Sequence, residues 1–224
     1  GLGNVLLRLN LYHEASSAFE RATNLAPLRA DLWNNRGNAL QNEGRTTEAL
    51  HAYGIARSLA GDNSYFVVNE AQCRLLMGDY ATAWPMYESR WQLSNVAHLA
   101  RKFEQPQWNG TESLAGKSIL LHAEQGFGDT LQFCRYAPLV ANRGGRVVLE
   151  VQPQLVSLLT GMTGVHQVLA RGDTLPAFDV HCPLLSLPLA FGTTLENIPA
   201  QVPYLRAQPE QVLAWRERLG PKTK

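Results

Sequence analysis

The stretch that decides the fold is Ser-Ile-Leu-Leu-His-Ala-Glu-Gln-Gly-Phe-Gly-Asp-Thr-Leu-Gln-Phe-Cys-Arg, residues 118–135. Its apolar run at 119–121 predicts a strand, and the glycines at 126 and 128 predict a bend. The apolar spacing that follows predicts a helix opening at Asp129. A strand, a glycine turn and a helix are typical of α/β sheets, in which ligands bind at the carboxyl ends of the strands.

The turn lacks the features of two common nucleotide-binding loops. A dinucleotide fingerprint has a third glycine three residues after the second, where this chain has Leu131. A P-loop has a lysine after its last glycine, where this chain has Asp129. A carboxylate at a helix N-terminus repels an anion. The sequence therefore argues against a phosphate at this turn and favours a neutral ligand.

Two interpretations of Asp129 follow from the residues alone. In the first, Asp129 is the N-cap of the helix, and Gln132 completes a variant capping box worth about 1 kcal/mol. In the second, its carboxylate faces a cleft and takes a proton from an incoming hydroxyl group. The two roles are compatible, and both stay open.

The composition bounds the class of protein. With 224 residues, of which 45% are hydrophobic, the chain can bury a core and is expected to form two domains. Charged residues make up 17% and the net charge is +1, so nothing points to nucleic acid or to an acidic membrane surface. No apolar run reaches the roughly 18 residues of a membrane span. The three cysteines show no metal or disulfide spacing, which favours a reducing, cytoplasmic location and no metal.

The first ninety residues repeat with a spacing of 34. Small residues recur at Gly3 and Gly37 and at Ala15, Ala49 and Ala83, and aromatic residues recur at Phe19, Tyr53 and Tyr87. This period, with small residues where helices cross, is typical of tetratricopeptide helix pairs. We expect about three pairs over residues 1–92, the first incomplete. In the third, Pro85 removes a backbone donor and predicts a kink or a shortened first turn.

Carboxamides recur with the same period. Asn35 and Asn69 are 34 residues apart, as are Asn4, Asn38 and Gln72. Each carboxamide can donate and accept at once, which suits holding a peptide backbone whatever its side chains. The arrangement resembles the asparagine ladder of O-linked N-acetylglucosamine transferase. The alternative is that asparagine is simply common on these helices.

The rest of the chain alternates strands and helices. Residues 93–112 lose the repeat pattern and predict a connector, and residues 113–224 predict an α/β domain. Strands are expected at 118–122, 146–151, 167–170 and 178–182, with a final helix at 209–219. Such alternation predicts a parallel sheet with right-handed crossovers. The expected fold class is α + α/β, with tetratricopeptide repeats followed by a Rossmann-like domain.

Two segments carry a resemblance to a known family. They are Glu-Gln-Gly-Phe-Gly-Asp-Thr-Leu-Gln-Phe-Cys-Arg-Tyr at 124–136 and Gly-Gly-Arg-Val-Val-Leu-Glu-Val-Gln at 144–152. They resemble bacterial tetratricopeptide proteins with a glycosyltransferase-like C-terminal part, which is similar to the heptosyltransferases. The resemblance covers nearly the whole chain. It implies that 113–224 is the N-terminal, acceptor half of a two-part GT-B fold.

The resemblance implies a function for the full protein. It would transfer a hexosyl or heptosyl unit from a nucleotide sugar, with Asp129 as base toward the acceptor hydroxyl. Near this turn or at a strand end, we expect substrate contacts from Glu124, Gln125, Gly126, Phe127, Gly128 and His181. Loop solvation of Glu124 and Gln125 and a backbone partner for His181 are the alternatives.

The resemblance also implies what this chain does not hold. The donor nucleotide sugar would bind to a second half beyond residue 224, and no other cofactor is expected. We therefore expect this chain by itself not to transfer sugar, because both substrates must be positioned together. The alternative function is a non-catalytic scaffold in which the repeats bind a protein or peptide partner.

Overall fold

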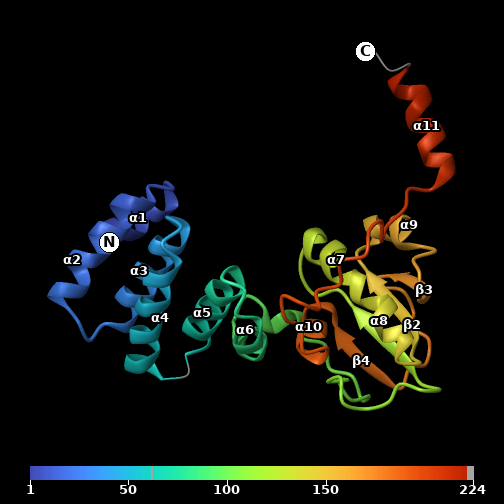
Figure 1. The fold of residues 1–224 in the computed structure, drawn as a ribbon, viewed down its shortest axis with the longest axis horizontal. Helices are drawn as coiled ribbons and strands as arrows, with labels where there is room; N and C mark the ends of the chain where they lie inside the picture. The colour runs from blue at the N-terminus through green and yellow to red at the C-terminus, as the bar shows by residue number, and fades with distance from the viewer. Residues whose placement is uncertain (62, 221–224) are drawn as a thin grey trace. The chain divides into compact units, whose positions relative to one another are not determined.

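The computed structural model describes residues 1–61 and 63–220 (Figure 1). The chain divides into two compact units. One consists of Gly1–Arg101 with Gly192–Asn197, and the other consists of Lys102–Phe191 with Ile198–Lys224. The segment expected as a connector is thus shared between the two units. The first unit is helical and the second holds a sheet, so the chain has the predicted α + α/β class.

The described part of the first unit contains three helix pairs. The leading helices are α1 (Leu2–Arg8), α3 (Ala30–Asn42) and α5 (Ser64–Leu76). The trailing helices are α2 (Tyr12–Leu25), α4 (Thr46–Ala60) and α6 (Tyr80–Tyr87), followed by the 3₁₀ turns η1 (Glu88–Gln92) and η2 (Ala97–Leu99). Each helix packs against the next along the chain. This is a tetratricopeptide-like stack.

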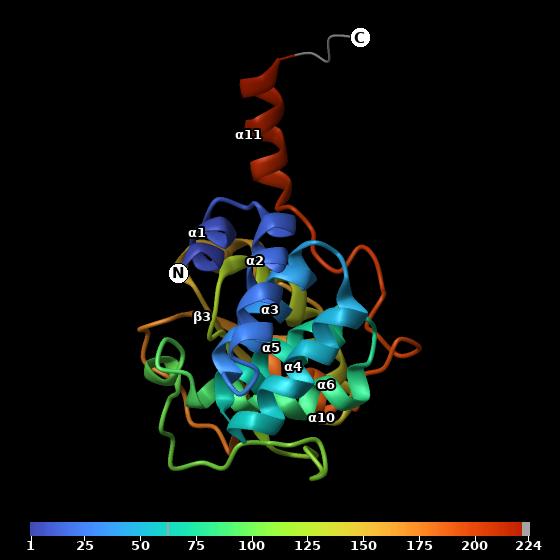
Figure 2. The same cartoon turned by 90° about the vertical axis from the view of Figure 1, so that its left-hand side faces the viewer.

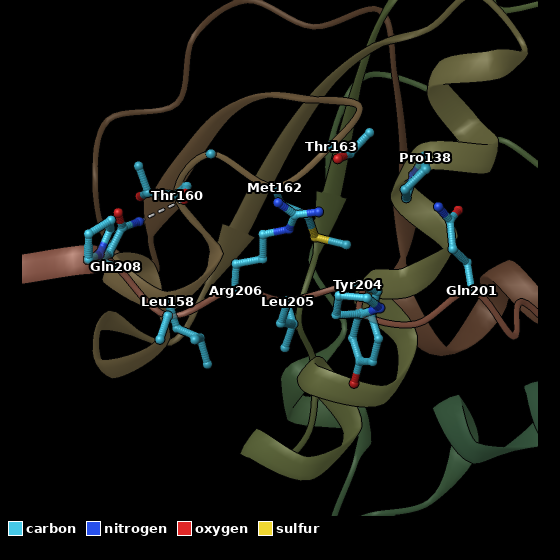
Figure 3. Close-up of a pocket in the computed structure, with 14 residues that line it drawn as sticks. Pro138, Leu158, Thr160, Met162, Thr163, Gln201, Tyr204, Leu205, Arg206 and Gln208 are labelled. Carbon is cyan, nitrogen blue, oxygen red and sulfur yellow. Dashed lines mark hydrogen bonds between the residues drawn. The ribbon is translucent and has the colours of Figure 1, made fainter. Parts of the chain in front are cut away.

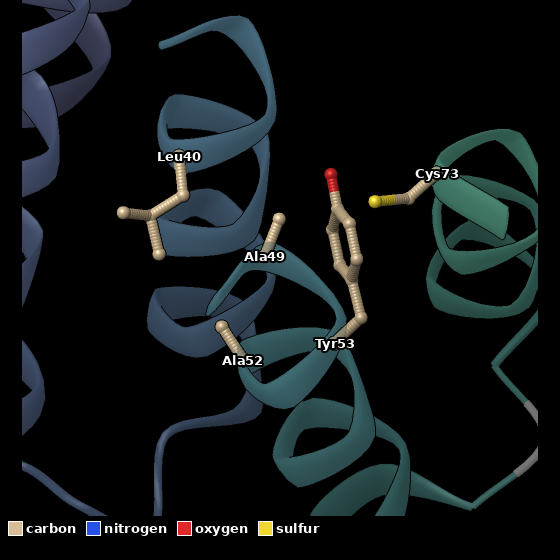
Figure 4. Packing of buried hydrophobic residues seen from close by; sticks show 5 residues of the cluster. All are labelled: Leu40, Ala49, Ala52, Tyr53 and Cys73. Atoms are coloured by element: carbon tan, nitrogen blue, oxygen red, sulfur yellow. The ribbon is translucent and has the colours of Figure 1, made fainter. Parts of the chain in front are cut away.

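The 34-residue recurrence has a packing cause. Gly3 and Gly37 lie so close to the rings of Phe19 and Tyr53 that a Cβ atom would be 2.6 and 2.5 Å from a ring carbon. Figure 4 shows Tyr53 between the alanines of α4 and Cys73 of α5. Glycine is therefore needed where a leading helix crosses the aromatic side chain of its trailing helix.

The third pair departs from the first two at its end. Pro85 is the sixth residue of α6, which stops at Tyr87 and continues as η1. The predicted shortening in the first turn is wrong, because the backbone bond that Pro85 cannot make belongs to the second turn. In η1 the buried Arg90 binds the Glu88 carboxylate at 2.5 Å, and its guanidinium lies over the Tyr87 and Trp91 rings.

The second unit is built on a parallel four-stranded sheet with the order β3-β2-β1-β4. The strands are β1 (Ser118–His122), β2 (Arg146–Val151), β3 (Val165–Ala170) and β4 (Val180–Pro183). The bounds of β1 and β2, which are buried almost throughout, are as predicted. β3 starts two residues earlier than predicted, because a strand at the sheet edge tolerates the exposed His166. β4 starts two residues later than predicted.

Short helices connect the strands. α7 (Phe127–Phe133), η3 (Cys134–Tyr136) and α8 (Ala137–Asn142) join β1 to β2, and α8 packs on β2 and β3. η4 (Pro153–Leu155) and α9 (Val156–Leu159) join β2 to β3, while η5 (Leu184–Ser186) and α10 (Leu187–Ala190) follow β4. Since β2 and β4 flank β1, the strand order reverses at β1, and its carboxyl end is where such sheets bind ligands.

The last described helix stands apart from the sheet. It is α11 (Pro209–Leu219), whose bounds match the prediction and which has no buried residue. Figures 1 and 2 both show it projecting from the α/β unit. Across the described residues, no helix is both long and apolar enough to span a lipid bilayer.

Candidate functional site

The glycine turn after β1 carries the first candidate site. α7 begins at Phe127 with Gly126 as its N-cap, so Asp129 is the third residue of the helix. The predicted N-cap role of Asp129 is therefore wrong. The helix starts two residues earlier than the apolar spacing indicated, because Phe127 and Gly128 are exposed and add nothing to that spacing.

Asp129 nonetheless caps the helix from within. Its Oδ2 accepts a hydrogen bond from the backbone N–H of Gly126 at 3.0 Å. This bond is one half of a capping box, and a glycine N-cap has no side chain to supply the other half. Asp129 is half-buried, and no hydrogen bond joins its Oδ1 to another group in the described part of the chain. The carboxylate thus combines a structural bond with an oxygen available to a ligand.

The loop residues predicted to contact substrate differ in exposure. Phe127 is 48% exposed, and the glycines on either side are exposed as well. Gln125 is half-buried, and Glu124 is only 2% exposed. Solvation, the alternative considered for Glu124, therefore does not apply. Among the loop residues predicted to contact substrate, Phe127 and the two glycines are the most exposed.

A partly buried hydrogen-bond network that the sequence did not reveal holds this loop. The carboxamide of Gln152 accepts from the Thr130 hydroxyl at 2.9 Å and donates to the backbone oxygen of Gln125 at 2.7 Å. The Arg171 guanidinium donates to the backbone oxygen of Ala123. Gln152 directly follows the buried strand β2. Because parallel strands end at a common edge of the sheet, that position could have predicted a contact with the loop after β1.

His181 lies inside the sheet, two residues before the end of β4 and opposite Leu120 of β1. Its Nδ1 is 3.2 Å from Nε2 of His122, and the two residues are 8% and 2% exposed. The ring of Phe103 lies with its centroid 4.6 Å from that of His181. The histidine predicted at a strand end thus belongs to a buried aromatic cluster.

The leading helices of the repeat unit carry the second candidate site. Nδ2 of Asn35 in α3 donates to Oδ1 of Asn4 in α1 at 3.3 Å. Nδ2 of Asn69 in α5 donates to Oδ1 of Asn34 in α3 at 2.9 Å. Carboxamides therefore join all three leading helices, with Asn34 as a member that the 34-residue spacing did not reveal.

Two further carboxamides complete the predicted set. Oδ1 of Asn38 accepts from the buried hydroxyl of Tyr53 at 2.8 Å. Gln72 is exposed on α5. The carboxamides of the leading helices form a carboxamide strip, which consists of Asn4, Asn34, Asn35, Asn38, Asn69 and Gln72.

Comparison with known proteins identifies similar proteins. Residues 1–27 match the tetratricopeptide repeat family. Protein FlbA of Caulobacter vibrioides is 24% identical over 283 residues, in an alignment that covers 100% of this chain and 47% of FlbA. The chain therefore spans about half the length of this curated relative.

Several solved structures are similar to part of the chain. PcrH in complex with the chaperone-binding region of PopD is 23% identical with a TM-score of 0.38, over 39% of this chain and 66% of PcrH. The Yersinia enterocolitica chaperone SycD with a peptide of YopD is 19% identical with a TM-score of 0.40, over 44% and 76%. The Sgt2 TPR domain of Aspergillus fumigatus is 24% identical with a TM-score of 0.38, over 39% and 58%.

Proposed function

We propose that the repeat unit binds an extended peptide along its leading helices. The observation that carries this proposal is the carboxamide strip, whose bonds run from α1 to α3 and from α3 to α5. A carboxamide that makes one hydrogen bond retains further donor and acceptor sites without any charge. A peptide backbone offers the complementary N–H and C=O groups at every residue. The strip suits a partner held by its main chain.

The test uses a peptide selected from a random display library against the whole chain. Asn35→Ala combined with Gln72→Ala should weaken binding at least tenfold in calorimetry, because both carboxamides lie on leading helices. Asn24→Ala is the control, since Asn24 is an exposed residue of the trailing helix α2. Methylation of peptide backbone nitrogens should weaken binding more than alanine substitution of its side chains. Unchanged binding by the double variant would refute the proposal.

We propose further that the α/β unit forms the acceptor side of a sugar-transfer site in a longer protein. The supporting observation is the Oδ1 atom of Asp129, in the first turn of the helix that follows β1, the strand at which the strand order reverses. In this role Asp129 takes the proton of an acceptor hydroxyl. The exposed ring of Phe127 offers an apolar surface for a sugar ring. The proposal assigns the donor nucleotide sugar to another part of that longer protein.

Asp129 can be tested against a closely matched aspartate. Asp173 accepts the backbone N–H of Ala170, three residues earlier, at 3.0 Å, as Asp129 does from Gly126. In the longer protein, Asp129→Asn should lower kcat for sugar transfer about 100-fold or more. Asp173→Asn should leave kcat unchanged. Full activity of Asp129→Asn would exclude its role as base.

The alternative for this unit is a scaffold without chemistry. If the longer wild-type protein transferred no sugar from any nucleotide-sugar donor offered, the scaffold would become the better account. The peptide proposal would then still stand, because it depends only on the carboxamide strip.

A further inference from the structure

The α/β unit contains a cavity away from the glycine turn. Its volume is about 410 Å³, within the range of small-molecule sites. Three chain segments line it: the start of α8, the end of α9 with the turn that leads to β3, and the extended segment at 201–209 (Figure 3). None of the residues of the carboxamide strip or of the turn at 124–129 lines it. The cavity is therefore separate from both proposed functions.

The extended segment is fastened to the rest of the unit without any ligand. The Tyr204 hydroxyl donates to the backbone oxygen of Leu131 at 3.1 Å, and the Arg135 guanidinium lies 4.4 Å from the centre of the Tyr204 ring. The Gln208 carboxamide donates to the backbone oxygen of Thr160 at 3.3 Å. These contacts hold the extended segment in place at Tyr204 and at Gln208. The cavity is therefore preformed, and a ligand need not order it.

Apolar residues make up part of the cavity lining. Leu158, Met162 and Leu205 contribute aliphatic side chains, together with prolines from α8 and from the extended segment. Met162 is buried, so its side chain is held in place by the protein around it. An apolar molecular body can displace water from such a surface.

Arg206 supplies the charge. It is the one charged residue among the fourteen that line the cavity. In Figure 3 its side chain rises from the extended segment toward the middle of the lining residues. Within the described part of the chain it forms no ion pair. Thr163 and Gln201 add uncharged polar groups.

We propose that this cavity binds a small organic anion, in which an apolar body carries one carboxylate or phosphate group. The guanidinium of Arg206 binds the oxyanion through two parallel N–H bonds. The body packs on Met162 and its aliphatic neighbours. No Asp or Glu lines the cavity, so no negatively charged side chain there repels an anion.

Met162 provides a local signal for the test. The chain has three methionines, and the other two, Met77 and Met86, belong to the repeat unit. The whole chain carrying ¹³C-labelled methionine methyl groups is titrated with 1-naphthoate, 1-naphthyl phosphate and uncharged 1-naphthol. We expect at least one of the two anions to shift the Met162 signal, assigned with Met162→Leu, with a Kd at least tenfold lower than that of naphthol. The tighter anion identifies the headgroup.

Paired variants separate charge from shape. Arg206→Gln should raise the Kd of the anion at least fivefold, toward that of naphthol. Arg216→Gln makes the same change on the exposed helix α11 and should leave the Kd unaltered. The proposal is overturned if neither anion moves the Met162 signal, if naphthol binds as tightly as the anions, or if Arg206→Gln binds the anion as wild type does.

Discussion

At the scale of single residues, Tyr53 joins the core of the repeat unit to its carboxamide strip. Its ring covers Gly37, and its hydroxyl lies 2.8 Å from Oδ1 of Asn38 and 3.0 Å from Oε1 of Gln41. One hydroxyl hydrogen serves both oxygens in turn. Burial, with the nearby Cys73 as a smaller cause, raises the pKa of this hydroxyl far above its ordinary value. Tyr53 therefore stays neutral and keeps Asn38 in place.

Removing the Tyr53 hydroxyl tests that link. Tyr53→Phe should lower the free energy of unfolding by about 1 kcal/mol, since two partly buried acceptors lose their shared donor. Urea unfolding measures the change. Tyr12→Phe is the control, because the Tyr12 hydroxyl makes an exposed bond to Asn10. An equal loss in both variants would contradict the assigned role of burial.

A buried thiol predicts a pH dependence. Burial raises the pKa of Cys134 from its ordinary value of 9.0 to about 12. At a pH between these two pKa values, the thiol is deprotonated in the unfolded chain and protonated in the folded chain. This group therefore makes the free energy of unfolding fall as pH rises. Unfolding measured at pH 8, 9 and 10 should show a shallower fall for Cys134→Ala than for wild type. Parallel curves for the two proteins would count against the raised pKa.

At the scale of elements, glycine decides how closely a leading helix approaches its partner. A Cβ atom at Gly37 would meet the Tyr53 ring at 2.5 Å, whereas a Cβ atom at Gly54 of α4 would meet nothing within 4 Å. The same residue type thus has opposite roles on neighbouring helices. At position 71 of α5 the chain carries alanine instead, and this alanine is fully buried.

The two glycines can be compared directly. Gly37→Ala should destabilise the protein by about 1–3 kcal/mol through overpacking. Gly54→Ala should be neutral or stabilise it by up to about 1 kcal/mol, because alanine has the higher helix propensity. Thermal unfolding of the two variants decides the matter. Destabilisation of similar size at both sites would show that helix crossing is not the cause.

The loop after β1 is held in place by the side chain of Gln152, the residue that follows β2. Gln152→Ala removes one of the two acceptors of the Thr130 hydroxyl, the other being the backbone oxygen of Gly126, and it removes the donor to Gln125. The loss should cost about 1–3 kcal/mol. Hydrogen exchange by mass spectrometry should become faster in peptides spanning residues 123–130. Thr160→Val, which removes a local bond to Val156, is a control that should leave this exchange unchanged. Unchanged exchange in Gln152→Ala would show that other contacts hold the loop.

At the scale of the whole molecule, the chain builds two units of different construction. The repeat unit depends on neighbouring helices in sequence order, whereas the sheet brings together strands distant in sequence. The helix α11 takes part in neither core: Trp215 is 56% exposed and Leu213 is 57% exposed. Its stability rests on local contacts: backbone hydrogen bonds and the Arg218 guanidinium, which lies 5.3 Å from the centre of the Trp215 ring.

Shortening the chain tests this description. A chain ending at Glu210 retains every residue that lines the cavity and should unfold within about 2 °C of the full chain, because α11 buries no side chain. Differential scanning calorimetry measures the two midpoints. A larger fall would mean that α11 packs on the protein in solution.

The amino-acid sequence by itself determined the elements with strong local patterns. The 34-residue period located the glycine and aromatic pairs that the structure shows in contact, such as Gly37 with Tyr53. The apolar runs located β1 and β2, and the proline start with its helical spacing located α11. These signals work because burial repeats with the geometry of one helix or one strand.

Only the tertiary structure decided which polar groups meet. Asn69 binds Asn34 rather than Asn35, Gln152 fastens the glycine loop, and His181 lies beside His122. The cavity around Arg206 is lined by segments that lie more than sixty residues apart in the sequence, because both Pro138 and the segment at 201–209 contribute to it. Hydrogen-bond partners and cavity walls depend on distances across the fold, and no periodic pattern along one segment carries that information.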